Sequence, residues 1–417
     1  MQRSLFAGVT GLRSHQTMMD VVGNNIANVN TPGYKGSRAT FQEALAQTIR
    51  GASGPTDELA GTNPMQVGLG SIVDDITGNF SQGALENTGR TGDLAIEGEG
   101  FFIVEGEEES FYTRDGSFSF DASGALTTGT GERVQGWGVD DDTGEVETTD
   151  PIDDIVIPAG LQTDPVATTE ATIGGNLSAG AEDGDTASSS IEIYDSLGNA
   201  STITLLFERQ AGGEWEVEAE IPGEPAPVAL GTLEFDSSGQ LDTGASSAVD
   251  GDGVLEITGI TAPGADPQDV AIDLLSDSPV LGVGGSTDVD FRSQNGAQSG
   301  VLREIDFGSD GTITGRFSDG APVVLGQVAL ATFDNPEGLV RNGGNLFSES
   351  INSGGALVDA PGVGAAGQLA PGTLEMSNVD LAEEFTNLIK AQRGFQANTR
   401  SITTTDEMLQ ELVNIKR

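Results

Sequence analysis

The single histidine and the many carboxylates are the side chains of this chain that could do chemistry. The sequence has 65 acidic residues, one histidine, His15, and no cysteine. A catalytic or metal-binding role for His15 would require partners that no other histidine or cysteine can provide. We therefore expect His15 to be a packing or interfacial residue.

Two acidic turns resemble the start of a calcium-binding loop. In VDGDGVLE, residues 249–256, the fifth ligand position counted from Asp250 is Val254, which cannot bind calcium. In DDDTGEVETTDP, which starts at Asp140, Glu145 stands where the loop needs glycine. Both are predicted to be solvated acidic turns, so no metal site is expected.

Carboxylate pairs are the remaining candidates for catalysis. Among so many acids some pair will lie within catalytic range, as in a glycosidase, but no spacing selects one pair. We predict no catalytic residue, no cofactor site and no enzymatic activity.

The composition of the chain limits the kinds of partner that it can bind. The formal net charge is −47, and only 18 residues are basic, so the chain repels phosphate backbones and anionic lipid surfaces. No window approaches the roughly 20 apolar residues of a membrane span, and the N-terminus has no signal-peptide core. Nucleic acid and membrane insertion are therefore not expected, and any export must proceed without a cleaved signal peptide. Self-association is expected where charge is sparse, which is in the terminal segments.

The first 30 residues have the apolar spacing of a narrow helical stripe. We predict that this stripe is an assembly seam formed by Leu5, Val9, Leu12, Met19, Val22, Ile26 and Val29.

The helix runs into NNIANVNTPGYK, residues 24–35. Pro32 disfavours a helical Thr31 and Gly33 tolerates positive φ, so the helix should stop near residues 28–30 and turn sharply. The predicted helix-exit and connector motif consists of Asn24, Asn25, Asn28, Asn30, Pro32, Gly33 and Tyr34.

A second, longer helix is predicted from Asp380 onward, with Asp380 as its N-cap and Glu383 as the capping-box partner. Because each terminal helix has only one apolar stripe, neither is stable alone, and each is expected to pair with the other. The second predicted assembly seam consists of Leu381, Phe385, Leu388, Phe395, Ile402, Leu409 and Leu412.

Between the helices the apolar pattern has period two. In GGEWEVEAEI, Trp215, Val217 and Ala219 alternate with glutamates, which is typical of a strand with one buried face. Strands separated by Asp-Gly and Ser-Gly turns predict antiparallel hairpins. The glycine- and proline-rich stretches 51–68 and 352–372 are predicted to be linkers.

The predicted fold class is mainly β with a terminal α-helical coiled coil. The chain is expected to be nested and multi-domain, with paired N- and C-terminal helices and two outer antiparallel β domains, the second inserted in the first. The predicted domains are 1–30 with 373–417 (helical), 31–75 (connector), 76–164 with 289–372 (β domain) and 165–288 (inserted outer β domain).

Motifs at both ends of the chain resemble one protein family. NNIANVNTPGYK, TGDLAIEGEGFFIV, YTRDGSFSFDASGALT and the stretch that starts LEMSNVDLAEEF are similar to motifs of the bacterial flagellar axial proteins, which comprise rod, hook and hook-associated proteins. The chain length, IYDSLGNASTITLLF and GQVALATFDNPEGLVRNGGNLF are most similar to the hook members.

The resemblance implies a structural subunit that polymerises into a curved tube, a universal joint transmitting torque from motor and rod to filament. It implies a homo-polymer whose partners are the rod, the hook-associated junction proteins, the hook cap and the type III export apparatus. It also implies an extracellular place in the flagellum. The alternatives are a distal rod or hook-associated subunit, or a secreted acidic adhesin or binding module.

Overall fold

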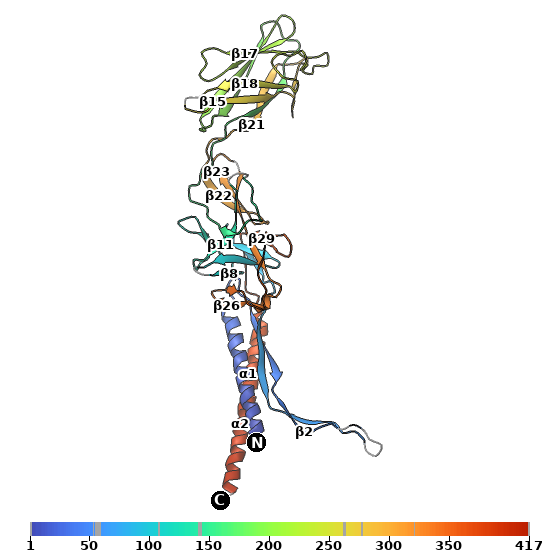
Figure 1. The fold of residues 1–417 in the computed structure, drawn as a ribbon, viewed down its shortest axis with the longest axis vertical. Coiled ribbons are helices and arrows are strands. Elements are labelled where there is room, and N and C mark those ends of the chain that lie inside the picture. Colours follow the sequence, from blue (N-terminus) through green and yellow to red (C-terminus); the bar gives the residue numbers. More distant parts are fainter. Residues whose placement is uncertain are drawn as a thin grey trace. The chain divides into compact units, whose positions relative to one another are not determined.

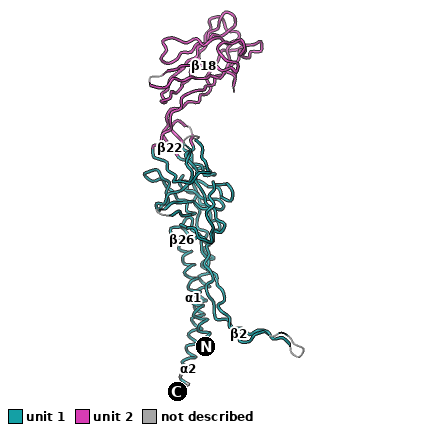
Figure 2. The backbone as a smooth tube through the Cα atoms, viewed as in Figure 1, with its two compact units in different colours: residues 1–159, 305–315, 324–417 teal, residues 160–304, 316–323 magenta. Residues whose placement is uncertain are grey.

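The computed structural model describes residues 2–52, 54, 60–106, 109–140, 144–261, 264–276, 278–320 and 322–415. They form two compact units, which Figure 2 colours separately. Unit 1 comprises residues 1–159, 305–315 and 324–417, and unit 2 comprises residues 160–304 and 316–323.

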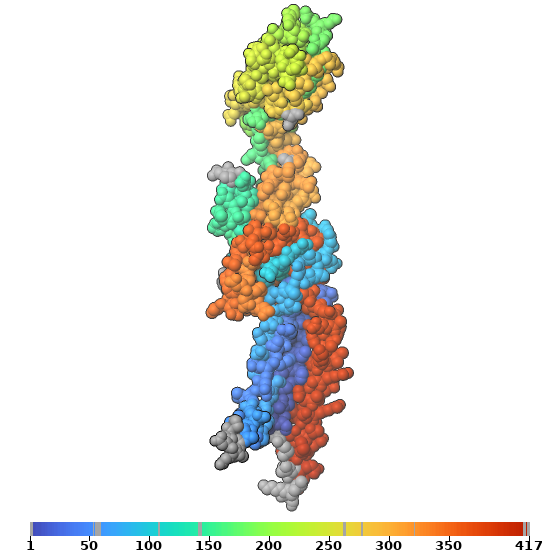
Figure 3. Space-filling view, turned by 90° about the vertical axis from the view of Figure 1, so that its right-hand side faces the viewer, coloured from blue at the N-terminus to red at the C-terminus, as the bar shows by residue number. Residues whose placement is uncertain are grey.

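Two long helices lie at the chain ends and belong to unit 1. α1 spans Gln2–Ala27 and α2 spans Leu381–Ile415, and the two pack side by side (Figures 1 and 3). They run antiparallel, because Gly8 lies against Ile402 while Gly11 lies against Asn398. The prediction of a mainly β chain with paired terminal helices is confirmed.

The start of α2 is capped as the sequence predicts. The Oδ1 atom of Asp380 accepts hydrogen bonds from the backbone nitrogens of Ala382 at 2.8 Å and Glu383 at 3.3 Å. These bonds satisfy two donors that have no partner within the helix. The N-cap therefore fixes where α2 leaves the preceding strand.

The largest sheet of the described chain joins segments far apart in sequence around an aromatic core. Phe101 makes edge-to-face contacts with Phe333 and Phe347, with ring centroids 5.8 and 5.9 Å apart. A short 3₁₀ helix, Pro336–Gly338, lies between two of its strands. The strands of this sheet are β7 (Phe101–Glu105), β8 (Ser110–Thr113), β9 (Ser119–Phe120), β10 (Leu126–Thr127), β11 (Arg133–Gly138), β12 (Asp153–Asp154), β22 (Leu302–Phe307), β23 (Thr312–Phe317), β24 (Pro322–Val328), β25 (Leu330–Thr332), β26 (Val340–Gly343), β27 (Leu346–Ser348) and β28 (Leu357–Asp359).

Four small antiparallel pairs complete unit 1 within the described residues. Two of them bring the C-terminal part of the chain beside residues 85–97, and the other two extend from the exit of α1. The pairs are β5 (Leu85–Asn87) with β30 (Thr373–Glu375), β6 (Leu94–Glu97) with β29 (Gln368–Pro371), β1 (Ser37–Glu43) with β4 (Ser71–Gly78), and β2 (Ala46–Arg50) with β3 (Met65–Gly68).

The predicted linkers are wrong where strands form in them. β3 lies within 51–68, and β28 and β29 lie within 352–372. Close backbone approach explains the glycines: a Cβ on Gly367 would lie 2.4 Å from the backbone oxygen of Glu97. Glycine therefore marks a tightly packed strand entry here.

Unit 2 is built from two sheets over one apolar core. Trp215, Val217 and Ala219 are buried while the intervening glutamates are half-buried, so the alternation predicted for this strand is confirmed. One sheet contains β14 (Thr186–Tyr194), β15 (Ala200–Arg209), β16 (Trp215–Glu220) and β17 (Val228–Leu233), and the other contains β13 (Glu170–Asn176), β18 (Val254–Ile260), β19 (Gln268–Asp273), β20 (Val280–Leu281) and β21 (Asp288–Gln294).

One turn design recurs in both units. In the turn that starts at Asp250, its Oδ1 accepts hydrogen bonds from the backbone nitrogens of Asp252 at 3.0 Å and Val254 at 2.9 Å. The same pattern occurs at Asp121 and Asp236. These carboxylates therefore close their own hairpins, as side chains of Asx turns do. The second calcium-like stretch includes residues 141–143, which lie outside the described residues.

The domain boundaries remain predictions. The ranges 165–288 for the inserted domain and 76–164 with 289–372 for its carrier are predicted to be segments that fold independently. Residues 31–75, predicted as a connector, contain β1, β2, β3 and most of β4.

Candidate functional site

The candidate site is the exit of α1, where both ends of the chain meet the β strands of unit 1. α1 ends at Ala27, and the backbone nitrogen of Thr31 donates to the Asn28 oxygen at 3.2 Å, which closes a turn. Gly33 has φ of +67°, and a Cβ there would lie 2.4 Å from the backbone nitrogen of Asp115. Gly33 is therefore required both by its conformation and by the space available.

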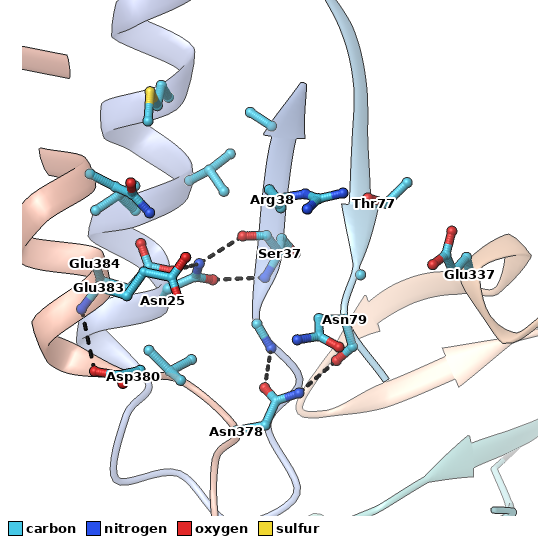
Figure 4. Close-up of a pocket in the computed structure, with 18 residues that line it drawn as sticks. Asn25, Ser37, Arg38, Thr77, Asn79, Glu337, Asn378, Asp380, Glu383 and Glu384 are labelled. Carbon is cyan, nitrogen blue, oxygen red and sulfur yellow. Dashed lines mark hydrogen bonds between the residues drawn. The ribbon is translucent and has the colours of Figure 1, made fainter. Parts of the chain in front are cut away.

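Asn25 joins three elements through one buried amide. Its Nδ2 donates to the Ser37 oxygen at 2.7 Å and to Oε1 of Glu384 at 2.8 Å, and its Oδ1 accepts from the Ser37 nitrogen at 2.9 Å. Figure 4 shows this side chain between α1, the start of β1 and the first turn of α2. The asparagine-rich motif thus has a structural reason, because an amide can both donate and accept at such a junction.

Asn378 makes the matching connection just before α2. Its Oδ1 accepts from the Gly36 nitrogen at 2.9 Å, and its Nδ2 donates to the oxygen of Asn79 at 2.8 Å (Figure 4). The same Nδ2 also donates to the oxygen of Ser81 at 3.0 Å. Asn25 and Asn378 therefore both fix the start of β1, and Asn378 also holds the residues that follow β4.

A buried ionic cluster lies beneath these amides. Lys35 Nζ lies 2.6 Å from Oε1 of Glu375, and Arg114 lies 3.3 Å from its Oε2. The Lys35 and Glu375 side chains are 1% and 0% exposed. Burial lowers the pKa of Lys35, and the carboxylate of Glu375 acts in the opposite direction. Glu375 also accepts from the Gly83 nitrogen at 2.7 Å, so one carboxylate joins segments from three parts of the sequence.

Other residues of unit 1 form hydrogen bonds with the backbone of the exit motif. Glu375 accepts a hydrogen bond through its backbone oxygen from the Gly33 nitrogen at 2.7 Å, and Asn345 donates to the Pro32 oxygen at 2.9 Å. Arg341 donates to the Lys35 oxygen and lies over the ring of Tyr34, 5.3 Å from its centroid. Residues on and beside the β strands thus hold the turn of the exit motif through hydrogen bonds to its backbone.

The remaining motif residues differ in burial. Asn24 is exposed and accepts a hydrogen bond from the Tyr34 hydroxyl at 2.7 Å, and Tyr34 itself is buried. Asn28 and Pro32 are half-buried, while Asn30 is exposed. The structure therefore brings Asn24, Asn25 and Tyr34 together and leaves Asn30 at the surface.

The predicted seam residues are placed unequally. In α1, Val22 is buried, and the half-buried residues are Leu5, Val9, Leu12, Met19 and Ile26, with Val29 just beyond the helix. In α2, Leu388, Phe395, Ile402 and Leu409 are half-buried, whereas Leu381 and Phe385 are exposed. The side chain of Leu412 lies outside the described residues. Their role in assembly remains a prediction.

Small residues that the apolar pattern missed form the closest contacts between the helices. A Cβ on Gly394 would lie 2.3 Å from the ring of His15, and one on Gly11 would lie 2.5 Å from the Asn398 side chain. Ala391 is fully buried and Thr405 is 3% exposed. His15 lies within this packing, and glycine and alanine at every third or fourth position are the signal that could have found the interface.

A crevice of about 370 Å³ lies beside Asn25, between the two helices, the start of β1 and the end of β4. Glu383 and Glu384 line it, and burial raises the pKa of Glu384. Within the described residues, no group of three or more histidine, aspartate or glutamate side chains could hold a metal ion. None of the helices in that part of the chain is long and apolar enough to cross a membrane.

Sequence signals for the ionic cluster were weak. Lys35 is one of only three lysines in the chain and stands inside the exit motif, which marks it as unusual in so acidic a sequence. Nothing local identifies Arg114 or Glu375 as its partners, because they lie 79 and 340 positions away.

Comparison with known proteins gives matches to successive parts of the chain. Four family models match: flagella basal body rod protein at residues 5–35, the flagellar hook protein FlgE/F/G D1 domain at 95–176, the flagellar basal body protein FlaE D2 domain at 160–301, and the flagellar basal body rod FlgEFG protein C-terminal at 370–415. The exit motif lies in the first of these matches, and Glu375 lies in the last.

Proteins that match the chain over its full length are flagellar proteins as well. The chain is 39% identical to the flagellar hook protein FlgE of Borreliella burgdorferi and 31% identical to the flagellar basal-body rod protein FlgG of Bacillus subtilis, with 100% of each chain covered. The crystal structure of Helicobacter pylori flagellar hook protein FlgE2 has the same fold over 70% of this chain and 100% of its own, with 14% identity and a TM-score of 0.50. This chain belongs to the family of the flagellar hook protein FlgE.

Proposed function

We propose that this chain is the structural subunit of a bacterial flagellar hook and that it polymerises into the curved tube that transmits torque from rod to filament. The full-length match to hook proteins carries this proposal. The chain itself supports it, because its two ends form one antiparallel helical element that is tied to the β strands through buried polar contacts.

The junction suits a subunit that transmits force. A pulling or twisting load on the helices passes to the strands through Asn25, Asn378 and the Lys35–Glu375–Arg114 cluster. Hydrogen bonds depend on direction, and a buried charge without its partner is costly, so the junction resists gradual bending. Helices and β strands of one subunit therefore move together.

Charge is segregated in a way that favours assembly through the terminal segments. Residues 1–30 and 380–417 contain seven basic and seven acidic residues, so the whole formal charge of −47 lies in residues 31–379. Like charges repel between neighbouring copies, and this repulsion is absent from the paired helices. The helices are the part of the subunit that can pack closely with other copies.

The finer parts of the proposal concern place and partners. The subunit is exported by the type III apparatus without a cleaved signal peptide and lies outside the cell, as part of the flagellum. Its neighbours are further copies, the rod, the hook cap and the hook-associated junction proteins. The role is structural, with no enzymatic activity.

A distal rod subunit is the second candidate, because a rod protein also matches the chain over its full length. Deleting the gene and isolating the basal bodies separates the two. Loss of a hook subunit leaves complete rods without hooks, whereas loss of a distal rod subunit leaves truncated rods.

Polymerisation of the purified chain tests the proposal directly. We expect tubes with a central channel in electron micrographs at moderate ionic strength. Leu388→Asp places a charge on the half-buried stripe and should abolish tubes, whereas Thr386→Asp on an exposed position of the same helix should not. A native chain that stays monomeric under all such conditions would favour the adhesin alternative.

A further inference from the structure

The sequence contains two Asn-Gly dipeptides, Asn342-Gly343 in unit 1 and Asn295-Gly296 in unit 2. At such a pair the backbone nitrogen of the glycine can attack the side-chain carbonyl carbon of the asparagine, because glycine has no side chain that hinders the approach. Both asparagines are exposed, so water reaches each of them. With the same chemistry and similar exposure, the two pairs are distinguished by how the fold holds them.

The fold restrains both reacting groups of Asn295-Gly296. Oδ1 of Asn295 accepts hydrogen bonds from the backbone nitrogens of Thr169 and Glu170, each at 3.0 Å, and its Nδ2 donates to Oγ1 of Thr169 at 2.8 Å. The backbone nitrogen of Gly296 donates to the side chain of Gln294. These bonds must break before the nitrogen can attack, so this pair is protected.

Asn342-Gly343 lies next to the turn of the β26–β27 hairpin and lacks such restraints. Asn342 is the extra residue of a β-bulge and has no partner in the opposite strand. Its side chain makes no hydrogen bond with any described residue. Gly343 has φ of +87°, and nothing lies within 4 Å of the position that a Cβ would take there. The side chain of Asn342 is therefore free to turn toward the Gly343 nitrogen.

The attacking nitrogen also lies where the hairpin opens most easily. Gly343 forms the last pair of the ladder, with Leu346, directly before the turn. The end of a short ladder opens at a much lower cost than the core of a folded unit. Opening of this one pair exposes the Gly343 nitrogen while the rest of unit 1 stays folded.

The same hairpin holds the exit motif. Arg341 donates a hydrogen bond to the Lys35 oxygen, and Asn345 donates to the Pro32 oxygen at 2.9 Å. Asn342 lies between these two contacts in the sequence. A change in the length of the backbone at Asn342 would therefore displace one contact relative to the other.

We propose that Asn342 deamidates spontaneously and that the isoaspartate formed there loosens the hold of the β26–β27 hairpin on the exit motif. The Gly343 nitrogen loses its proton and bonds to Cγ of Asn342, the bond between Cγ and Nδ2 breaks, and Nδ2 leaves with that proton as ammonia. Water then opens the cyclic imide at either carbonyl group, which gives aspartate or isoaspartate. In isoaspartate the main chain runs through Cβ and Cγ, so it is longer by a methylene group and carries a new carboxylate.

The reaction needs only water and the folded chain, so it is independent of polymerisation. Peptide mapping by mass spectrometry of the purified full-length chain, kept at mildly alkaline pH, measures it at both asparagines. Each product is identified by the mass gained when –NH₂ becomes –OH, and isoaspartate is distinguished from aspartate by its fragment ions. Asn342 should react about tenfold faster than Asn295, because several hydrogen bonds protect Asn295. Equal rates in the folded chain would overturn the proposal.

The same measurement in urea shows whether the fold causes the difference. Both dipeptides are then unfolded, and their rates should converge. A ratio that persists in urea would also overturn the proposal, because the cause would lie in the local sequence rather than in the hydrogen bonds.

Two variants test the two sites separately. Thr169→Ala removes the acceptor of the Asn295 amide at an exposed position, so deamidation at Asn295 should rise several-fold while that at Asn342 stays the same. Asn342→Gln keeps an amide but lengthens the side chain, which disfavours the cyclic imide, so no product should form at this position. Unchanged deamidation at Asn295 in Thr169→Ala would show that its hydrogen bonds do not protect it.

Hydrogen exchange of the aged chain tests the effect on the exit motif. Residues 31–35 should exchange several-fold faster in the deamidated chain than in the Asn342→Gln chain aged beside it, and unit 2 should exchange equally in both. Freshly prepared Asn342→Asp supplies the new charge without the added methylene group, so it should exchange like the native chain. Exchange at residues 31–35 that deamidation leaves unchanged, or that Asn342→Asp raises equally, would refute loosening by the longer backbone.

Discussion

Unit 2 and the helix junction of unit 1 are held together in different ways. In unit 2, neighbouring strands such as β14, β15 and β16 pair in sequence order over a core that contains Trp215 and Phe207. At the junction, contacts join residues hundreds of positions apart through polar atoms, as between Lys35 and Glu375. Local apolar pairing forms one region, and long-range polar recognition forms the other.

This difference bears on how each region responds to change. An apolar core loses stability gradually when one side chain is trimmed, since its neighbours relax in part. A buried polar junction fails more abruptly, because each lost partner leaves another group without compensation. The junction should therefore be the more sensitive region for a given loss of atoms.

The largest effect on the junction is expected from Glu375→Ala. The change leaves Lys35 and Arg114 buried without their carboxylate, and we expect the free energy of unfolding of unit 1 to fall by about 3–5 kcal/mol. Hydrogen exchange followed by mass spectrometry measures the two units separately. Unit 2 should keep its protection.

Glu383→Ala provides the control for this prediction, because Glu383 is exposed in the neighbouring first turn of α2. Its effect should stay within about 0.5 kcal/mol. Equal effects of the two variants would show that the ionic cluster does not hold the junction.

Gly33→Ala should have the next largest effect. A left-handed φ costs a residue with a Cβ about 1–2 kcal/mol, and here the Cβ also meets the backbone of Arg114 and Asp115 at 2.4–2.7 Å. Gly89 is a matched control, since its φ is +68° and nothing lies within 4 Å of its Cβ position. Urea unfolding should show a clearly larger loss for Gly33→Ala, and similar losses would mean that only backbone strain matters.

Sequence reasoning succeeded where structure is local. The helix end near residues 28–30, the positive φ of Gly33, the cap at Asp380 and the alternation from Trp215 follow from propensity and periodicity. Periodicity also indicated one stripe on α2, but the closest helix contacts come from glycine, alanine and asparagine, which an apolar pattern does not count.

The ionic cluster could not be predicted in the same way. Lys35, Arg114 and Glu375 meet only because β5 pairs with β30 and the exit motif lies beside both. Pairing over such distances is decided by the packing of the whole unit rather than by neighbours in sequence. β29 inside the second predicted linker was missed for the same reason, since its partner β6 is remote, whereas β3 pairs with the nearby β2.

Tyr34→Phe should have a smaller effect, about 1 kcal/mol. It removes the hydroxyl that donates to Asn24 at 2.7 Å and keeps the ring beneath Arg341. Tyr194→Phe in unit 2 is the matched control, because its hydroxyl donates to Glu192 at 3.0 Å in a hydrogen bond that is exposed to solvent. Thermal unfolding should show a larger loss for the junction variant. A larger loss from Tyr194→Phe would contradict the contrast between the regions.

The smallest expected effect is on the stability of the chain at acid pH, and it should be the same in both units. The Ser123 hydroxyl and the Ala125 nitrogen lower the pKa of Asp121 in unit 1, and the Ser238 hydroxyl and the Gln240 nitrogen lower the pKa of Asp236 in unit 2. A carboxylate whose pKa is lowered by folding contributes stability above its unfolded pKa, about 3.9, and loses it as the pH falls through the folded value. Asp121→Asn and Asp236→Asn remove the titrating group and keep an oxygen that can accept the same bonds. Unfolding midpoints measured from neutral pH downward should therefore fall less steeply for each variant than for the native chain below about pH 4. A flattening confined to one unit would show that the shared turn chemistry does not act equally in both.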